Sequence, residues 1–192
     1  STIFVRGAQP VIVNNIFRDN LGPVISVNPN SMNSELNPDW GRSTGELIET
    51  SAFKNNVGPL IRQNSIGNNG LNGLEVRGET LTTETVWDDT DIVHIVRDEI
   101  IVPNHHSFSG LRLQSSETES LVVKLFGSTA GFTATGSPGD IDDRIGGTVH
   151  IIGTPGHPVI FTSVSDDTFG AGLDPMGQPQ NDTTNDGPSE PA

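Results

Sequence analysis

The chain contains no cysteine and no tyrosine, and its only lysines are Lys54 and Lys124. Without cysteine it can form neither a disulfide framework nor a thiolate metal site. The formal net charge of −14 at pH 7 leaves no basic surface for phosphate groups, so we expect no binding to nucleic acid. No stretch stays apolar for the roughly 18 residues that a spanning helix needs, so we expect no membrane insertion.

Long amphipathic helices are also absent from the sequence pattern. Apolar residues do not recur with the three-to-four residue spacing of a helix face over any long stretch. The 22 glycines and 13 prolines instead indicate many turns, and the hydrophobic content of 32% is low for a compact two-layer fold. We therefore predict an all-β chain made of short strands and long polar loops.

A weak internal repeat suggests how these strands are arranged. The segments 15–28 (NIFRDNLGPVISVN), 51–64 (SAFKNNVGPLIRQN) and 64–78 (NSIGNNGLNGLEVRG) each contain an apolar residue, an asparagine turn, a glycine and a short strand. The first two segments align without a gap, so that Phe17 pairs with Phe53 and Asn20 with Asn56. A repeat of this kind is typical of solenoids, in which each unit stacks on its neighbour.

Two architectures fit this repeat. In a parallel β-helix, short strands stack on those of the coil below, and asparagine at a recurring corner tolerates the left-handed backbone conformation while bonding the next asparagine. In the alternative, pairs such as Asn72-Gly73 mark hairpin turns of an antiparallel sandwich. We favour the parallel β-helix because a hairpin need not repeat the whole plan of strand, asparagine turn, glycine and strand.

The rest of the chain supplies further strand-like runs and a core. We predict strands at 85–96, 99–102, 110–114, 121–125, 147–152 and 159–163. Residues 1–165 would form the coils, with a loop inserted at 29–50, and residues 166–192 an acidic loop or tail that continues into a longer protein. Candidates for the stacked core are Ile12, Ile16, Val24, Ile25, Leu60, Ile66, Leu74, Val76, Ile92, Val93, Ile100, Leu111, Leu113, Val122, Leu125, Val149, Ile151, Val159 and Phe161.

The same strings resemble a known group of proteins. The asparagine-turn repeats look like the right-handed parallel β-helix of pectate-lyase-like proteins. The strings NGLEVRG, VWDDTDIVHIV, GLRLQSSETESLVVKL and GTPGHPVIFTSVSDDTFGAG resemble coil-plus-loop units of very large secreted bacterial surface proteins. This resemblance implies a right-handed parallel β-helix and an extracellular or cell-surface location, and it implies little about chemistry.

The acidic C-terminal stretch is a candidate calcium site. Residues 182–187 (DTTNDG) resemble the first half of a calcium loop in which alternate side chains face the ion and glycine makes the sharp turn. Thr184 departs from that pattern. Asp166 and Asp167 follow a predicted strand, so Asp166, Asp167, Asp182 and Asp186 are the candidate ligands, and a solvated loop is the alternative.

Other polar clusters suggest weaker sites. Trp87 with Asp88, Asp89 and Asp91 could contact a carbohydrate, because a tryptophan ring stacks on sugars and paired carboxylates serve acid and base chemistry. The carboxylates at 140, 142 and 143 are followed by an arginine that can neutralise them, and the adjacent histidines 105 and 106 would point to opposite sides of an extended segment. We expect no metal at these last two places.

From these features we expect a structural or adhesive module of a secreted or cell-surface protein, stabilised by calcium, in preference to an enzyme. Its partners would be adjoining coils of a longer chain or a second copy that associates end to end. The alternative is a carbohydrate-active β-helix that binds or cleaves acidic polysaccharide with calcium as a bridge. Fold resemblance alone does not decide between these functions.

Overall fold

In the computed structural model, residues 1–8, 10–32, 56, 59–103, 110–136 and 146–189 are described. Their regular structure is all strand except for one short 3-10 helix, η1 (Pro29–Ser31). The strands are β1 (Ile3–Val5), β2 (Val11–Val13), β3 (Ile16–Arg18), β4 (Pro23–Val27), β5 (Leu60–Arg62), β6 (Ser65–Gly67), β7 (Leu71–Val76), β8 (Glu84–Trp87), β9 (His94–Val96), β10 (Glu99–Val102), β11 (Gly110–Gln114), β12 (Leu121–Leu125), β13 (Gly131–Ala134), β14 (Thr148–Ile152) and β15 (Val159–Ser163). The described part also holds no helix long and apolar enough to cross a membrane.

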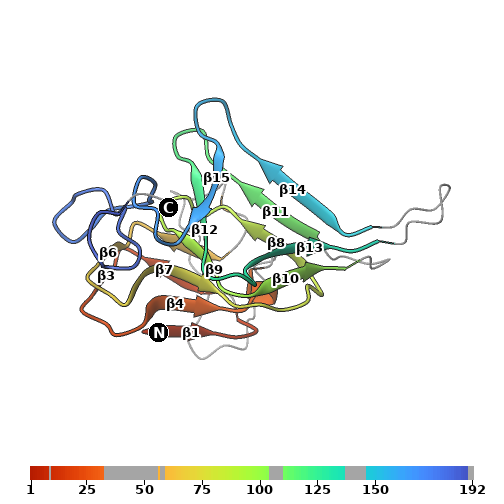
Figure 1. Ribbon diagram of the computed structural model, residues 1–192, viewed down its shortest axis with the longest axis horizontal. Coiled ribbons are helices and arrows are strands. Elements are labelled where there is room, and N and C mark those ends of the chain that lie inside the picture. Colours follow the sequence, from red (N-terminus) through yellow and green to blue (C-terminus); the bar gives the residue numbers. More distant parts are fainter. Residues whose placement is uncertain (9, 33–55, 57–58, 104–109, 137–145, 190–192) are drawn as a thin grey trace, which may run out of the picture.

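Every pair of these strands is parallel. The largest sheet has the order β1-β4-β7-β9-β12-β15, a second has the order β14-β11-β8, and the pairs β10-β13, β2-β5 and β3-β6 make the others (Figure 1). Parallel neighbours need long connections, so the hairpins of an antiparallel sandwich do not occur among these strands. The prediction of an all-β chain is confirmed.

The register of the repeat differs from the gapless alignment of the sequence. Phe17 lies opposite Ile66, 49 residues later, rather than opposite residue 53, and Leu60 of β5 lies opposite Val11 of β2. The third segment of the repeat, 64–78, is therefore the one that stacks on 15–28. The offset is the same on both sides of a local bulge between Pro23 and Ile25, since Ile25 lies opposite Leu74 and Val27 opposite Val76.

Asparagines mark the corners of these stacked segments. Asn15 donates from Nδ2 to Oδ1 of Asn64 over 3.1 Å, and Asn20 donates likewise to Asn69 over 2.7 Å. The residue before each of these asparagines has positive φ: 60° at Asn14, 61° at Asp19, 58° at Gln63 and 56° at Asn68. The expected corner chemistry is thus present, divided between one residue that takes the left-handed conformation and a following asparagine that bonds across the stack.

Alternate strand residues fill the core. Of the candidate core residues, Ile12, Val24, Ile25, Leu60, Ile66, Leu74, Val76, Ile92, Val93, Ile100, Leu111, Leu113 and Val122 are buried, while Leu125, Val149 and Val159 are partly buried. Ile16 is 67% exposed and its neighbour Phe17 is buried instead, an error of one residue in the alternation of β3. Ile151 and Phe161 are also exposed.

The predicted run 85–96 is two strands in two different sheets. β8 ends at Trp87, and β9 begins at His94. Within 92–95 the side chains alternate between two cores: Ile92 packs in the main core, whereas Val93 and Ile95 pack in a second cluster with Val122. β13 was not predicted, because its sequence GFTA lacks an aliphatic alternation.

Candidate metal centre

The acidic C-terminal segment packs against the sheets instead of extending into solvent. From Val164 onward the chain turns back, and Leu173 forms a parallel bridge with Ser65 of β6. The backbone N–H of Asn72 donates to the carbonyl of Thr183 over 2.8 Å, and Thr183 is only 1% exposed. The described residues 164–189 therefore form an ordered cover beside β6 and β7.

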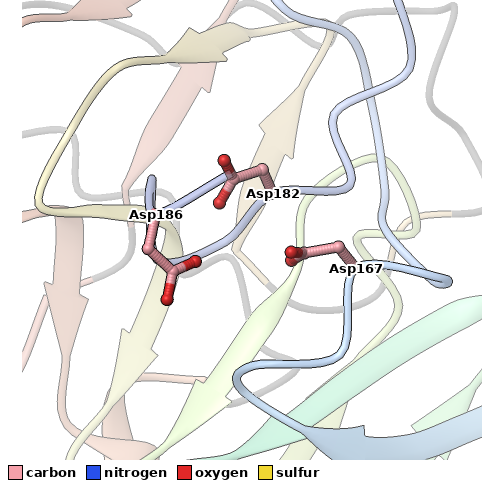
Figure 2. A group of neighbouring side chains, drawn as sticks. All are labelled: Asp167, Asp182 and Asp186. Carbon is pink, nitrogen blue, oxygen red and sulfur yellow. The ribbon is translucent and has the colours of Figure 1, made fainter. Parts of the chain in front are cut away.

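Three of the four predicted calcium ligands lie together. Asp167, Asp182 and Asp186 each offer a carboxylate oxygen, and these oxygens lie within 4.8 Å of one another (Figure 2). Asp182 holds the turn around them, because its two oxygens accept from the backbone N–H of Asn185 over 2.6 Å and of Gly187 over 3.0 Å. Positive φ at Asn185 (60°) and Gly187 (90°) makes the turn sharp.

Asp166 is not part of this group. It is 2% exposed, and its carboxylate accepts hydrogen bonds from the hydroxyl groups of Thr162 and Thr168. These bonds, that from Thr162 first, lower the pKa of Asp166 below its usual value. Asp166 therefore holds the turn that follows β15, while Asp167 faces the cluster.

Asp167 has an oxygen suited to a cation. Its Oδ2 accepts from the backbone N–H of Ser189 over 2.8 Å and from the Ser189 hydroxyl over 2.9 Å. Its Oδ1 is buried and has no hydrogen-bond partner among the described residues. A buried carboxylate oxygen without a donor is costly, and a bound cation would relieve that cost.

Lys124 lies beneath the cluster and was missed by the sequence analysis. It projects from β12 and is fully buried, and its Nζ donates to the backbone carbonyls of Asp166 over 2.6 Å and of Asn181 over 3.1 Å. Burial lowers its pKa, while Asp167, Asp166 and Asp182 oppose that shift. One ammonium beside the three clustered carboxylates leaves a net local charge of −2. The signal in the sequence was a single lysine within the aliphatic run LVVKL.

The candidate carbohydrate residues are mostly buried. Trp87 is 0% exposed, and its ring stacks on His94 with centroids 5.3 Å apart and planes 11° apart. Asp89 is also 0% exposed, Asp91 is half-buried, and Asp88 lies half-buried beside them. Trp87 therefore presents no ring face on which a sugar could stack, and this prediction gains no support.

The carboxylates of Asp89 and Asp91 instead accept backbone hydrogen bonds that a neighbouring strand would otherwise accept from the β5 segment. The carboxylate of Asp89 accepts from the backbone N–H of Ile61 over 2.9 Å, and that of Asp91 accepts from Gln63 over 2.5 Å. Alternate N–H groups of β5 point the same way, so two carboxylates spaced two residues apart bond the side of β5 that faces away from β2. Burial raises the pKa of Asp89 well above its usual value and raises that of Asp91 as well.

A groove of about 520 Å³ lies between the β12 to β15 region and the C-terminal segment. Its lining includes Glu119, Val122, Phe169 and Asn181, and the Phe169 side chain is 44% exposed. Behind Glu119, the Nη1 of Arg62 lies 3.5 Å from Glu119 Oε2 and 3.5 Å from Asp91 Oδ1. This groove was not predicted, because its residues come from segments far apart in the sequence.

No protein family model, curated protein or solved structure matches the chain. The resemblance to pectate-lyase-like repeats therefore stays a prediction. The carboxylates at 140, 142 and 143 and the histidines at 105 and 106 lie outside the described residues.

Proposed function

We propose that this chain is a structural or adhesive module of a secreted or cell-surface protein, built as a right-handed parallel β-helix. The observation that carries the proposal is the repeated parallel stacking: β11 pairs with β8 on one side and β14 on the other, as β12 pairs with β9 and β15. Such stacking is what a solenoid requires, and the right-handed sense follows the strong preference of parallel crossovers.

A bound calcium ion stabilises the module in this proposal. Asp167, Asp182 and Asp186 would hold it, and the support is their proximity, the unpaired Oδ1 of Asp167 and the local charge of −2. Calcium takes six to eight oxygen ligands, and extracellular modules bind it at millimolar to submillimolar concentrations. The ion would fix the C-terminal segment against the sheets by neutralising carboxylates that otherwise repel one another.

Thermal unfolding followed by circular dichroism tests this role. A site that binds only the folded chain adds about 2.7 kcal/mol at 100 times its dissociation constant, which corresponds to about 5–10 °C for a chain of this size. The midpoint should rise by that amount between excess EDTA and saturating calcium. The rise should be lost in Asp186→Asn, whose carboxylate is exposed and bonds only Thr184 among the described residues.

Asp174→Asn is the matched control. It removes the same charge from the same segment but lies outside the cluster, and an asparagine can still accept from Met176 and Gln178 as Asp174 Oδ1 does. The calcium-induced rise should persist in this variant. An unchanged midpoint in the wild-type chain, or a rise that survives Asp186→Asn, would show that the cluster holds no calcium.

A carbohydrate-active role is the second candidate, and the groove beside Phe169 is the observation that favours it. Glu119 and the partly exposed Phe169 ring could contact a sugar, while Arg62 behind them pairs with two carboxylates. Incubation with polygalacturonate and calcium, followed by ultraviolet absorbance of unsaturated products, distinguishes the two functions. Product formation that Glu119→Gln abolishes would favour the enzyme; no product and no retention on the polysaccharide would favour the structural module.

A further inference from the structure

One end of the stacked strands is open and apolar. β13, β14 and β15 each pair on one side only, with β10, β11 and β12 respectively. Among the described residues no strand pairs with their other edges. Figure 1 shows β14 and β15 at the side of the molecule opposite to β1. Unpaired strand edges of this kind are sites at which another chain can add.

The core-facing side chains of this end are uncovered. Ile151 lies opposite Leu113 and Phe161 lies opposite Val123, two residues that are 0% exposed. Ile151 is nevertheless 53% exposed and Phe161 41% exposed, because no further layer covers them. At the other end, the first core residues Val5, Ile12 and Phe17 are only 5–8% exposed. Among the described residues, the core side chains are therefore more exposed at the β13 to β15 end than at the β1 end.

The three strands at this end carry no charged residue. β13 (GFTA), β14 (TVHII) and β15 (VIFTS) contain no Asp, Glu, Lys or Arg, in a chain whose formal net charge is −14. Two copies that approach through most other surfaces bring carboxylates together. Two copies that meet through these three strands bring together apolar side chains and strand edges, with no charged strand residue in the contact.

We propose that two copies of this chain associate through the β13 to β15 end across a two-fold axis. An axis in the plane of the end that passes through β15 places β15 antiparallel to β15 of the second copy and β14 antiparallel to its β13. Ile151 and Phe161 become covered, and the free strand edges find partners. Because the same surface serves both copies, the assembly closes at two. β1, β2 and β3 also pair on one side only, but their core residues Val5, Ile12 and Phe17 are already buried, so head-to-tail stacking would cover less exposed core than the two-fold contact does. Neither the calcium site nor the structural role is needed for this dimer.

Sedimentation velocity over a concentration series tests the proposal. The wild-type chain should convert from monomer to dimer, stop at two copies, and keep its affinity when salt is raised. Ile151→Asp should raise the dimer dissociation constant by at least about 100-fold, because an unpaired carboxylate would be buried in the interface. Leu21→Asp makes the same kind of change at a fully exposed residue near the β1 end and should leave the dimer intact.

Cysteine cross-linking gives a second measurement that does not rely on a destabilising variant. The chain has no cysteine of its own, so Phe161→Cys, at the middle of β15, introduces a single thiol. Under oxidation this variant should form a disulfide-linked dimer, whereas Leu21→Cys should stay monomeric on a denaturing gel. A wild-type chain that is monomeric at every concentration would overturn the proposal. Growth beyond two copies, or loss of association in Leu21→Asp, would overturn it in favour of head-to-tail stacking.

Discussion

His94 should make the fold sensitive to mild acid. It is fully buried, its ring stacks on Trp87, and neither ring nitrogen makes a hydrogen bond of good geometry to a described residue. Burial lowers its pKa from 6.5 to about 3, so the folded chain excludes a proton that the unfolded chain accepts. The stability contributed by neutral His94 is therefore complete above about pH 6.5 and is lost progressively as the pH falls toward 3.

The size of the effect follows from these two values. Between pH 7 and pH 5 the unfolded imidazole gains most of a proton and the folded one gains almost none, so the free energy of unfolding falls by about 2 kcal/mol. Asp89 acts in the opposite direction, because its raised pKa favours the folded state at low pH. Comparing the wild-type chain with His94→Phe cancels the contribution of Asp89 and isolates that of the imidazole.

Urea unfolding followed by circular dichroism at pH 7 and pH 5 measures this difference. His94→Phe keeps a ring against Trp87. Between pH 7 and pH 5 its unfolding free energy should fall by about 2 kcal/mol less than that of the wild-type chain. Ile100→Val is the control, because it loses core volume but keeps His94. Its unfolding free energy should lie below that of the wild-type chain by the same amount at pH 7 and at pH 5. Equal pH dependence in the wild-type chain and in His94→Phe would refute the reasoning.

Two further predictions concern buried polar groups. In Asp89→Asn the amide oxygen can still accept from the backbone N–H of Ile61, but the carboxyl group with the raised pKa is gone. The unfolding free energy of the wild-type chain should therefore fall relative to that of this variant as the pH rises above about 3.8. A difference between the two chains that is equal at about pH 4.5 and about pH 7.5 would contradict this. Lys124→Met leaves two carbonyls of the C-terminal segment without a donor and should cost about 2–4 kcal/mol, with faster amide exchange in residues 164–189. Arg18→Met removes the same charge from an exposed ion pair and should cost less than about 1 kcal/mol; equal losses for both variants would show that Lys124 does not anchor the segment.

Local sequence patterns were sufficient to place several of the strands. The runs at 99–102, 110–114, 121–125 and 159–163 coincide with β10, β11, β12 and β15, because alternation of aliphatic residues and flanking turns is a local signal. The spacing of carboxylates in 182–187 likewise predicted that Asp182 and Asp186 share a turn. Asp167 was assigned to the same group from its position after a strand, and the fold brings it there across 15 residues.

Other features depended on which segments became neighbours. The WDDTD run looked like a surface site, since its residue types suit sugar binding, but Asp89 and Asp91 bond the backbone of β5 and Trp87 fills the core. The register of the repeat depended on which of two similar segments stacks on 15–28, and the role of Lys124 depended on a segment more than 40 residues away.

The sequence by itself determined that the chain is all-β, acidic and turn-rich, because composition and the two-residue alternation act within a few residues. Only the tertiary structure decided which strands stack, which carboxylates are buried, and which end of the stack is left open. Burial and pairing in parallel sheets join residues tens of positions apart, and each depends on the free energy of the whole assembly of strands rather than on any local stretch.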